Sequence, residues 1–596
     1  MRTAFLIAAA ASQSTGRRLA RSRSRASALL ALFAALGLAS AATAQTPAIR
    51  FAVQPPPAPA QMQIYRLAPT SAPVDFINEK LVAARLPALQ TEARLLVARG
   101  ATGQTDLDRV RVYVDPVSGD AHLIPNLAEL VSAAAPRAPA PVERLQALGR
   151  AALTDVRFIP KDVTEARVGD AITVMGGSTT RAAAAAPTEA RVVMTLVPAV
   201  RYAAGLPVYG RGSHASVALA NDGTVVGALR RWRTASLGDR IQPTITTEQV
   251  RADIQRQLSS YVAQAGSSAV VDKIELAYYD ANADYLQPVY YFEATLTPGV
   301  DTISPIKIAG YVPVGKPLEP IPDLAAPLSG PAPGATRTAL PEHAVGPQGD
   351  APTAGDITLG EFVNQDWPTS SAYLDMANSF FSGLASGSQP VTRTIWWTAY
   401  PWQVVGAQSV KWMNAVNVAY TEPHGDWLVN STLSNCCQAW HVPDIGTGGA
   451  PGFGHAAGGV LATWIIMSCE VIPSYYDRQN QIGGPGDAFA AWWPVFQGLH
   501  NAIAFRTVMF YPDDALNYGF GADAARGGDV NAAWFDEVAA IDGNRGTYTS
   551  KHLVGAPTVH YDRASTMIDG RDLGQSIFSV GAQSASTTLW SFWMDN

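Results

Sequence analysis

The spacing of apolar positions changes partway along this chain. In the first half, apolar residues recur at helical spacing in three segments, which predicts helices at residues 76–86, at 141–153 and from 246 onward. The third helix begins at Thr246, three residues before Gln249, which is the spacing of a capping box. Shorter apolar runs predict strands at residues 110–114, 120–125, 189–196, 214–220, 224–231, 273–279, 289–296 and 306–312. This half is therefore expected to be α+β, with a hairpin turn at Asn221-Asp222-Gly223.

Beyond residue 356 the pattern becomes that of an α/β protein. Helices are predicted at residues 372–384 and 487–498. Strands that are apolar throughout and that alternate with helices are typical of a mostly parallel sheet flanked by helices. Functional side chains of such a sheet gather at the carboxyl ends of the strands. The continuous apolar runs that predict these strands are residues 394–398, 416–421, 460–467 and 502–510.

A proline-rich segment separates the two halves. Residues 317–356 contain nine Pro in forty residues and almost no apolar periodicity, so an extended linker is expected there. Of the 14 Trp only Trp232 precedes residue 360, and all three Cys follow it, which supports a two-part chain. The predicted division is signal peptide 1–44, Pro/Ala-rich segment 45–62, α+β module 63–135, further α+β module or modules 136–315, Pro-rich linker 316–356 and α/β domain 357–596.

The first 44 residues have the composition of a secretory signal peptide. They carry six Arg and no acidic residue, and a short apolar run at residues 28–38 precedes Ala42-Thr43-Ala44. A basic start, an apolar stretch too short to cross a bilayer and an A-x-A site are the parts of such a signal. The pair Arg17-Arg18 leaves twin-arginine export open as an alternative. The mature protein is expected to be secreted or periplasmic.

Charge and hydropathy narrow the classes of partner. Removing the six Arg of the signal peptide leaves 37 Lys and Arg against 49 Asp and Glu, which takes the formal charge from −6 to −12. A chain this acidic is not expected to bind nucleic acid. After the signal peptide, no apolar run is long enough to predict a membrane span. The composition predicts no particular oligomeric state.

Two predicted strand ends carry residues suited to nucleophilic chemistry. The run 416–421 leads through Glu422-Pro423 to His424 and Gly425, and the run 460–467 leads through Ser468 to Cys469. A cysteine hydrolase needs a thiol that attacks and an imidazole that stabilises the thiolate or protonates the leaving group. A glycine beside them lets its backbone N–H approach a substrate carbonyl as an oxyanion donor. The candidate catalytic residues are therefore His424, Cys469 and Gly425.

Other interpretations of these residues stay open. Cys469 is alternatively a buried structural thiol, or a disulfide partner of Cys436 or Cys437. A zinc site is a further alternative, but no pair of its candidate ligands has the i, i+4 spacing of an H-E-x-x-H helix, so neither a metal nor a cofactor is predicted. The candidate ligands of that alternative are Glu422, His424, His441, His455, Glu470 and His500.

The C-terminal half resembles the caspase-like cysteine peptidases, the group that includes caspases, legumains, gingipains and separases. Their signature is an apolar block, His-Gly, a spacer, a second apolar block and Cys, which residues 416–425 and 461–469 match. Residues 498–505 resemble the helix-to-strand step that follows the Cys, and a bacterial family of unknown function with this core is similar around residues 493–500, 505–507 and 533–535. The resemblance implies a caspase-like fold with a His-Cys dyad acting on a peptide or protein. Glu470 departs from it, because a carboxylate beside Cys469 raises the pKa of the thiol.

The N-terminal half is similar to propeptide modules of secreted bacterial peptidases, the PepSY-like and fungalysin/thermolysin-propeptide-like domains. Helix-then-hairpin units in tandem, residues 205–210 ahead of a strand, and residues 288–292 carry this similarity over about residues 60–315. It implies a chaperone or inhibitor of the C-terminal domain, and a generic α+β spacer is the alternative.

Together these features predict a secreted cysteine peptidase or related acyl hydrolase regulated by its N-terminal region. The alternative is a non-catalytic exported binding or envelope protein that keeps the fold without the reaction.

Overall fold

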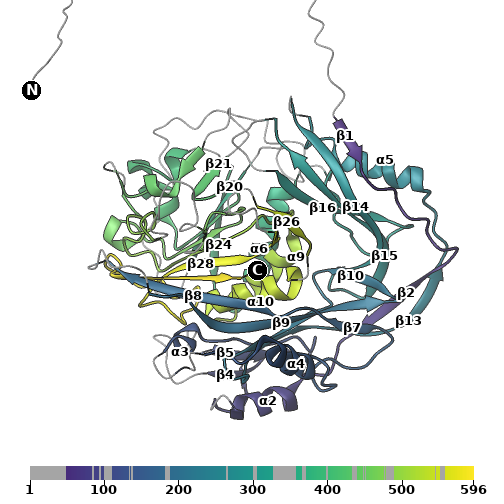
Figure 1. Cartoon of the computed structure of the whole chain (residues 1–596), viewed down its shortest axis with the longest axis horizontal. Coiled ribbons are helices and arrows are strands. Elements are labelled where there is room, and N and C mark those ends of the chain that lie inside the picture. The colour runs from purple at the N-terminus through teal and green to yellow at the C-terminus, as the bar shows by residue number, and fades with distance from the viewer. Residues whose placement is uncertain are drawn as a thin grey trace, which may run out of the picture. The chain divides into compact units, whose positions relative to one another are not determined.

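Strands from both halves of the chain share the sheets of this protein (Figure 1). The structure is a computed structural model that describes residues 48–595 except 84–85, 93–94, 100–109, 133–134, 136–137, 182–187, 264–265, 300–304, 327–356, 365–370, 398–400, 432–438, 448, 450, 475–476, 478–488, 544 and 551–557. The α-helices within the described residues are α2 (Val74–Ala83), α3 (Leu127–Leu130), α4 (Val142–Leu153), α5 (Thr247–Leu258), α6 (Ala372–Leu384), α9 (Asp514–Ala524) and α10 (Val530–Asp542).

One sheet consists mainly of strands from the N-terminal half. Its long centre is the antiparallel set β14, β15 and β16. β1 and β10 pair in parallel with β14. β2 lies between β15 and β13 and pairs antiparallel with both. On its outer edge β16 pairs in parallel with β25, a strand of the C-terminal half. The bounds are β1 (Ala48–Phe51), β2 (Met62–Ala68), β10 (Leu206–Gly210), β13 (Thr234–Ile241), β14 (Ser268–Asp280), β15 (Tyr285–Thr297), β16 (Ile306–Pro313) and β25 (Phe510–Tyr511).

A second, mixed sheet runs from one half of the chain into the other. Its C-terminal strands follow the order β18, β17, β19, β23, β24, all parallel, and then the antiparallel β28 and β29. These strands have the bounds β17 (Ile357–Val363), β18 (Val391–Trp397), β19 (Val418–Thr421), β23 (Thr463–Ile466), β24 (Asn501–Phe505), β28 (Ala564–Asp569) and β29 (Thr588–Met594).

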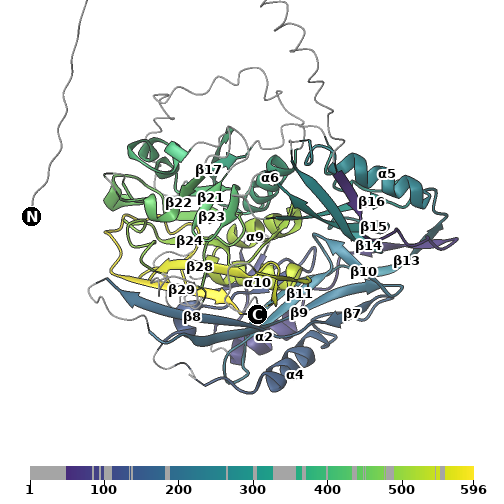
Figure 2. The ribbon, with the colours of Figure 1, turned by 45° about the horizontal axis from the view of Figure 1, so that its top comes forward.

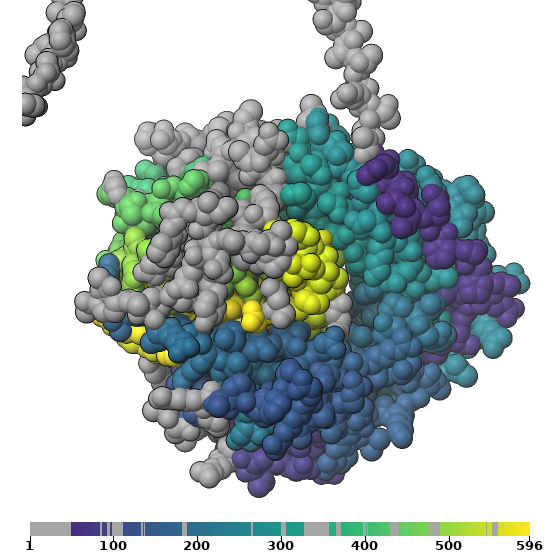
Figure 3. Space-filling model, in the orientation of Figure 1, coloured from purple at the N-terminus to yellow at the C-terminus, as the bar shows by residue number. Residues whose placement is uncertain are grey.

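The sheet continues into the N-terminal half through β29, which pairs with β8 along its whole length. From β8 the order is β9, β11, β12, β6, β5, β4, β3, all antiparallel, and β7 pairs with the other end of β9. The space-filling view shows the yellow C-terminal residues directly against blue N-terminal ones (Figure 3). The bounds are β3 (Gln90–Glu92), β4 (Leu95–Arg99), β5 (Val110–Val114), β6 (Ala121–Leu123), β7 (Glu165–Val168), β8 (Ile172–Thr180), β9 (Arg191–Ala203), β11 (His214–Leu219) and β12 (Val225–Arg231).

Helices α9 and α10 are buried between the halves. α9 packs against α6, and α10 packs against β9, β11, β12 and β28 (Figure 2). Asp513 caps α9 by accepting a hydrogen bond from the Leu516 N–H at 2.9 Å, and Asp529 caps α10 through the Asn531 and Ala532 N–H groups. Every residue of α10 except Ile541 is buried. A helix enclosed on all sides has no polar face, so no amphipathic period marks it in the sequence.

Buried ion pairs connect α9 and α10 to N-terminal strands. Arg231 of β12 lies 2.8 Å from Asp523 and also contacts Glu537. His122 of β6 lies 3.0 Å from Asp523 and 2.9 Å from Asp536. Burial opposes a charge on His122, but the two carboxylates outweigh it and raise the pKa of the imidazole to about 10. The cations come from the N-terminal half and the carboxylates from the C-terminal half, so each half provides the partners of the other half's buried charges.

Many of the predicted elements are confirmed. The helix predicted at residues 372–384 is α6, and the strand predicted at 110–114 is β5, each with the predicted bounds. Thr246 and Gln249 form the predicted capping box at α5. β11 and β12 form the predicted hairpin, and the turn is closed by the Ala220 N–H donating to Thr224 at 2.8 Å.

Two predictions of secondary structure are wrong. Residues 489–495 form turns instead of part of a helix, and Pro494, which has no backbone N–H, lies among them. The single strand predicted at residues 502–510 is interrupted between β24 and β25, where Arg506 leaves the ladder to pair with Asp477 at 2.7 Å. The C-terminal strands from β18 to β24 are parallel, as predicted, and the sheet as a whole is mixed because β28, β29 and the N-terminal strands pair antiparallel. The α/β class itself is confirmed.

The Pro-rich linker is described only in part. Residues 316–326 lie along the N-terminal sheet, where Leu324 is 3% exposed and Gln287 accepts a hydrogen bond from the Leu318 N–H at 2.9 Å. The rest of the linker and the predicted signal peptide lie outside the described residues. Residues 47–596 form one compact unit, and the predicted division into domains stays a prediction. Among the described helices, none has the length and apolar character needed to cross a membrane.

Candidate functional site

The segments that carry His424 and Cys469 leave the sheet side by side. β19 and β23 are adjacent and parallel, with Thr421 opposite Ile466 at their carboxyl ends. Just beyond, the Met467 N–H donates to the Thr421 carbonyl at 2.8 Å. His424 begins a short strand, β20 (His424–Asp426), which pairs with β21 (Val429–Ser431) and through it with β22 (Ala439–His441). Both candidate residues therefore lie at the same edge of the sheet.

Gly425 lies directly against the Cys469 peptide. A Cβ atom at Gly425 would overlap the Cys469 carbonyl oxygen and the Ser468 hydroxyl, and would lie 2.7 Å from the Cys469 nitrogen. Two main chains approach this closely only where one residue has no side chain. The structure thus brings Gly425 and Cys469 into contact, and His424 is the residue next to Gly425.

The imidazole of His424 is held by helix α6. Its Nε2 atom lies 3.3 Å from the hydroxyl of Tyr373, and the two rings meet edge to face with centroids 6.3 Å apart. The Tyr373 ring in turn packs on Tyr511 of β25 at 4.8 Å. His424 is 7% exposed. The Tyr373 hydroxyl therefore orients the imidazole through a hydrogen bond.

Cys469 is a free, partly exposed cysteine whose thiol is protonated at neutral pH. The pKa of the thiol is raised to about 12, mainly by burial of the sulfur and to a smaller extent by charge repulsion from Glu470, Asp562 and Asp426. The Met509 N–H, which donates to Sγ at 3.4 Å, acts in the opposite direction. The repulsion expected from Glu470 is therefore present but is smaller than the effect of burial.

Alkylation of Cys469 is expected to follow this high pKa. Because the thiolate is the reactive form, the rate with iodoacetamide should rise about tenfold for each pH unit through the alkaline range. Mass spectrometry of a chain carrying Cys436→Ser and Cys437→Ser would isolate the signal of Cys469. A rate that levels off near the ordinary thiol pKa of about 8.5 would contradict a buried, protonated thiol.

Glu470 is held in an unusual conformation beside the thiol. Its backbone has a φ of 56°, which non-glycine residues seldom adopt. Its Oε1 atom accepts a hydrogen bond from the Tyr548 hydroxyl at 2.9 Å, and that hydroxyl accepts one from the Val508 N–H at 3.0 Å. A cavity of about 290 Å³ lies here, lined by Glu470, Val508, Tyr548, Thr549 and Tyr561 and, from the N-terminal half, by Thr295, Pro305 and Lys307.

The N-terminal sheet reaches the segment that contacts the thiol. Met509, the donor to Cys469, directly precedes β25, and β25 pairs in parallel with β16 through Phe510 opposite Lys307. The Phe510 N–H donates to Asp562 at 2.8 Å. One edge of β25, the strand that follows the Met509 contact to Cys469, is therefore occupied by a strand from residues 306–313.

Glu422, two residues before His424, does not act as a charged partner. Its side chain is 1% exposed, and neither carboxylate oxygen has a hydrogen-bond partner. Burial raises its pKa well above the usual range, and Glu361, Asp514 and Asp375 add to the rise. Burial therefore favours the neutral form of the Glu422 carboxyl over the charged form.

The candidate ligands of the zinc alternative are dispersed. His441 is exposed, the His455 ring lies 2.8 Å from the Gly459 carbonyl, and His500 bonds the Gly581 carbonyl at 3.0 Å. Burial lowers the pKa of His500 to about 4. Within the described ranges, no three His, Cys, Asp or Glu residues are grouped so that they could hold a metal ion. Cys436 and Cys437 lie outside those ranges.

Sequence patterns did not indicate Tyr373, Met509 or Tyr548 as parts of the site. They come from α6, from the segment before β25 and from β26 (Thr547–Thr549), which pairs with β27 (Thr558–His560). No motif links residues so far apart along the chain, so only their packing assembles them around His424 and Cys469.

Comparisons with known proteins assign no family. No protein-family model matches the chain, and no curated protein is significantly similar to it. Among solved structures, an uncharacterized protein from Eubacterium rectale is similar at 10% sequence identity, with a TM-score of 0.25 over 44% of this chain and 85% of that one.

Proposed function

We propose that this chain is an exported cysteine peptidase or related acyl hydrolase with a caspase-like C-terminal half. The observation that carries the proposal is the contact between Gly425 and the Cys469 peptide at the ends of two adjacent parallel strands. A nucleophile, an imidazole and a backbone N–H donor are the groups that acyl transfer requires. The His-Gly and Cys signature of the sequence supports the same assignment.

The proposed reaction starts from a protonated thiol. His424 takes the proton from Cys469 as the sulfur attacks the substrate carbonyl, and the Gly425 N–H donates a hydrogen bond to the resulting oxyanion. His424 then gives the proton to the leaving group as the bond between carbonyl carbon and leaving group breaks. Water, deprotonated by His424, attacks the thioester, which releases the acid and restores the thiol.

Regulation by the N-terminal half forms part of the proposal. β16 occupies the edge of β25, the strand that follows the Met509 contact to Cys469. A free edge of that kind is where an extended peptide adds to a sheet. Together with the high pKa of the thiol, the occupied edge supports a resting state in which the N-terminal region acts as a propeptide does.

The activity is expected to depend on both members of the dyad. Cys469→Ala removes the nucleophile and His424→Ala removes the base, so each should reduce hydrolysis of a mixed peptide library by about 1,000-fold or more. Cys436→Ser serves as the matched control and should keep the activity. Hydrolysis would be followed by mass spectrometry of the cleaved peptides. Equal activity in Cys469→Ala and the parent chain would exclude the proposed nucleophile.

The second candidate is an exported binding protein that keeps this fold without turnover. The pKa of the Cys469 thiol, about 12, favours it, because a protonated thiol attacks carbonyls poorly. This candidate predicts no hydrolysis in the parent chain, and also none after the chain is cut within residues 327–356. The peptidase predicts hydrolysis that rises after that cut.

A further inference from the structure

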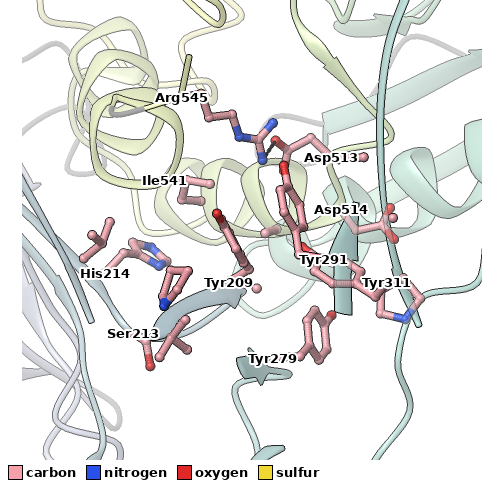
Figure 4. A pocket seen from close by; sticks show the side chains of 18 of the residues that line it. Tyr209, Ser213, His214, Tyr279, Tyr291, Tyr311, Asp513, Asp514, Ile541 and Arg545 are labelled. Atoms are coloured by element: carbon pink, nitrogen blue, oxygen red, sulfur yellow. Dashed lines mark ion pairs between the residues drawn. The ribbon is translucent and has the colours of Figure 1, made fainter. Parts of the chain in front are cut away.

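A cavity enclosed between the N-terminal sheet and helix α9 has the features of a ligand site (Figure 4). Its volume is about 160 Å³, comparable to cavities that hold a ligand the size of benzene. Four neighbouring strands each contribute one tyrosine to its wall: Tyr209 from β10, Tyr279 from β14, Tyr291 from β15 and Tyr311 from β16. The opposite side includes Asp513 and Asp514, at the start of α9, and Arg545.

The tyrosines form a continuous aromatic wall. Tyr209 stacks on Tyr291 with centroids 4.1 Å apart, Tyr291 meets Tyr311 at 5.7 Å, and Tyr311 meets Tyr279 at 4.8 Å. The faces of such rings carry negative potential and attract cations. The Lys273 ammonium already makes such a contact, since it lies 5.0 Å from the centroid of the Tyr291 ring.

The cations at this cavity are already paired with acids. Lys273 lies 2.9 Å from Glu275 and 3.3 Å from Glu293. Arg545 lies 3.1 Å from Asp513 and 2.8 Å from Asp542. Each cation therefore has more than one acidic partner, so the cavity has no positive charge left for an anion.

Asp514 is the carboxylate of the cavity that lacks a partner of opposite charge. It forms no ion pair within the described part of the chain, and its buried Oδ1 atom has no hydrogen-bond partner. Burial is the main reason that the pKa of Asp514 rises to about 7, and the charge of Arg211 and a hydrogen bond with the Ser379 side chain act against it. Arg211 also donates a hydrogen bond to the Ser379 hydroxyl at 2.9 Å. A cation placed here would relieve the loss of solvation of the carboxylate.

A second, more open cavity adjoins the first and shares lining residues with it. Its volume is about 590 Å³, and it shares Tyr279, Asp514 and the apolar residues Pro322, Leu324 and Pro512 with the enclosed cavity. It adds the carboxyl groups of Glu319, Asp375 and Asp323, the last of which pairs with Arg256 at 2.8 Å, and Arg211 is its one basic lining residue within the described ranges. The Oε2 atom of Glu319 is also buried without a hydrogen-bond partner. Acidic groups therefore line both cavities, and the two cavities share Asp514 and an apolar lining.

We propose that the adjoining cavities bind a linear aliphatic diamine, with one ammonium group at Asp514 and the other near Glu319. The ammonium groups supply N–H donors and charge for the unpartnered carboxylate oxygens. The methylene chain matches the apolar wall that the cavities share, and the tyrosine rings favour the ammonium in the enclosed part. This proposal is independent of the proposed hydrolase activity, since Cys469 and His424 line neither cavity.

Calorimetric titration of the full chain with putrescine tests the proposal. One molecule is expected to bind, and butylamine, which has a single ammonium group, should bind about tenfold more weakly or worse. The neutral 1-butanol should give no binding signal. Asp514→Asn keeps the side-chain shape without the charge and should weaken putrescine binding about tenfold or more. Asp239→Asn, at a carboxylate 88% exposed, is the matched control and should leave the affinity unchanged.

The outcomes that would overturn the proposal are specific. Equal affinity for putrescine and 1-butanol would make the site a merely apolar cavity, and no binding at millimolar putrescine would exclude a diamine site. If circular dichroism shows that Asp514→Asn is unfolded, Glu319→Gln replaces it, with the same weakening expected. A variant that folds and binds putrescine as the parent chain does would equally overturn the proposal.

Discussion

Replacing Arg231 with Met is expected to lower the free energy of unfolding by about 3–5 kcal/mol. Arg231 is 4% exposed and contacts both Asp523 and Glu537, whose side chains are fully buried. Without the guanidinium, Asp523 keeps only His122 as a partner of opposite charge among the described residues. The loss of stability exceeds the net contribution of the ion pair to stability, because a buried carboxylate without its cation keeps the full desolvation penalty. Urea denaturation followed by circular dichroism would measure it.

An exposed ion pair is the matched control for Arg231→Met. Arg66 lies 3.9 Å from Asp239, and their side chains are 61% and 88% exposed. Arg66→Met should therefore change the free energy of unfolding by about 1 kcal/mol or less. If both substitutions had equally small effects, the buried ion pairs would not connect the two halves as the structure indicates.

Replacing Gly425 with Ala is expected to damage both the fold and the proposed reaction. The added Cβ would overlap backbone atoms of Cys469, which cannot move aside as a flexible side chain can. Separating the two segments should lower the free energy of unfolding by about 1–3 kcal/mol. A displacement of about 1 Å in the site should also reduce hydrolysis about 100-fold or more. Denaturation curves and peptide hydrolysis would be measured on the same preparation.

The control for Gly425→Ala is a glycine with open space around it. A Cβ atom at Gly581 would meet no atom within 4 Å, so Gly581→Ala should leave both properties unchanged. A Gly425→Ala chain of unchanged stability would show that the two segments are not in contact. If Gly425→Ala lowers the stability but the parent chain shows no hydrolysis, the result supports the contact between the two segments and excludes the hydrolase activity.

Local sequence signals predicted the elements that local physics determines. The capping box at Thr246 and the Asn221-Asp222-Gly223 turn depend on hydrogen bonds within a few residues, so both are readable from the chain. Helix α6 was predicted with its bounds because it has a buried and a more exposed side. Helix α10, which is buried except at Ile541, was not predicted, since its sequence has no such asymmetry.

Part of the candidate site was equally readable. His424, Gly425 and Cys469 follow apolar runs that become neighbouring parallel strands, so their approach follows from the pattern once the order of strands is known. The tyrosine that holds His424 and the backbone donor to Cys469 come from distant segments without a motif. The high pKa of the thiol depends on burial that no neighbouring residue in the sequence reveals.

The sequence by itself determined the two-part composition, most of the local elements and the residues of the candidate dyad, because these depend on neighbours along the chain. Tertiary structure decided that the parts share sheets, through β29 with β8 and β16 with β25. It also decided that buried charges such as Arg231 and Asp523 meet across the predicted boundary. Strand edges and buried charges are satisfied by partners hundreds of residues away, and their pairing becomes visible only when the chain is folded.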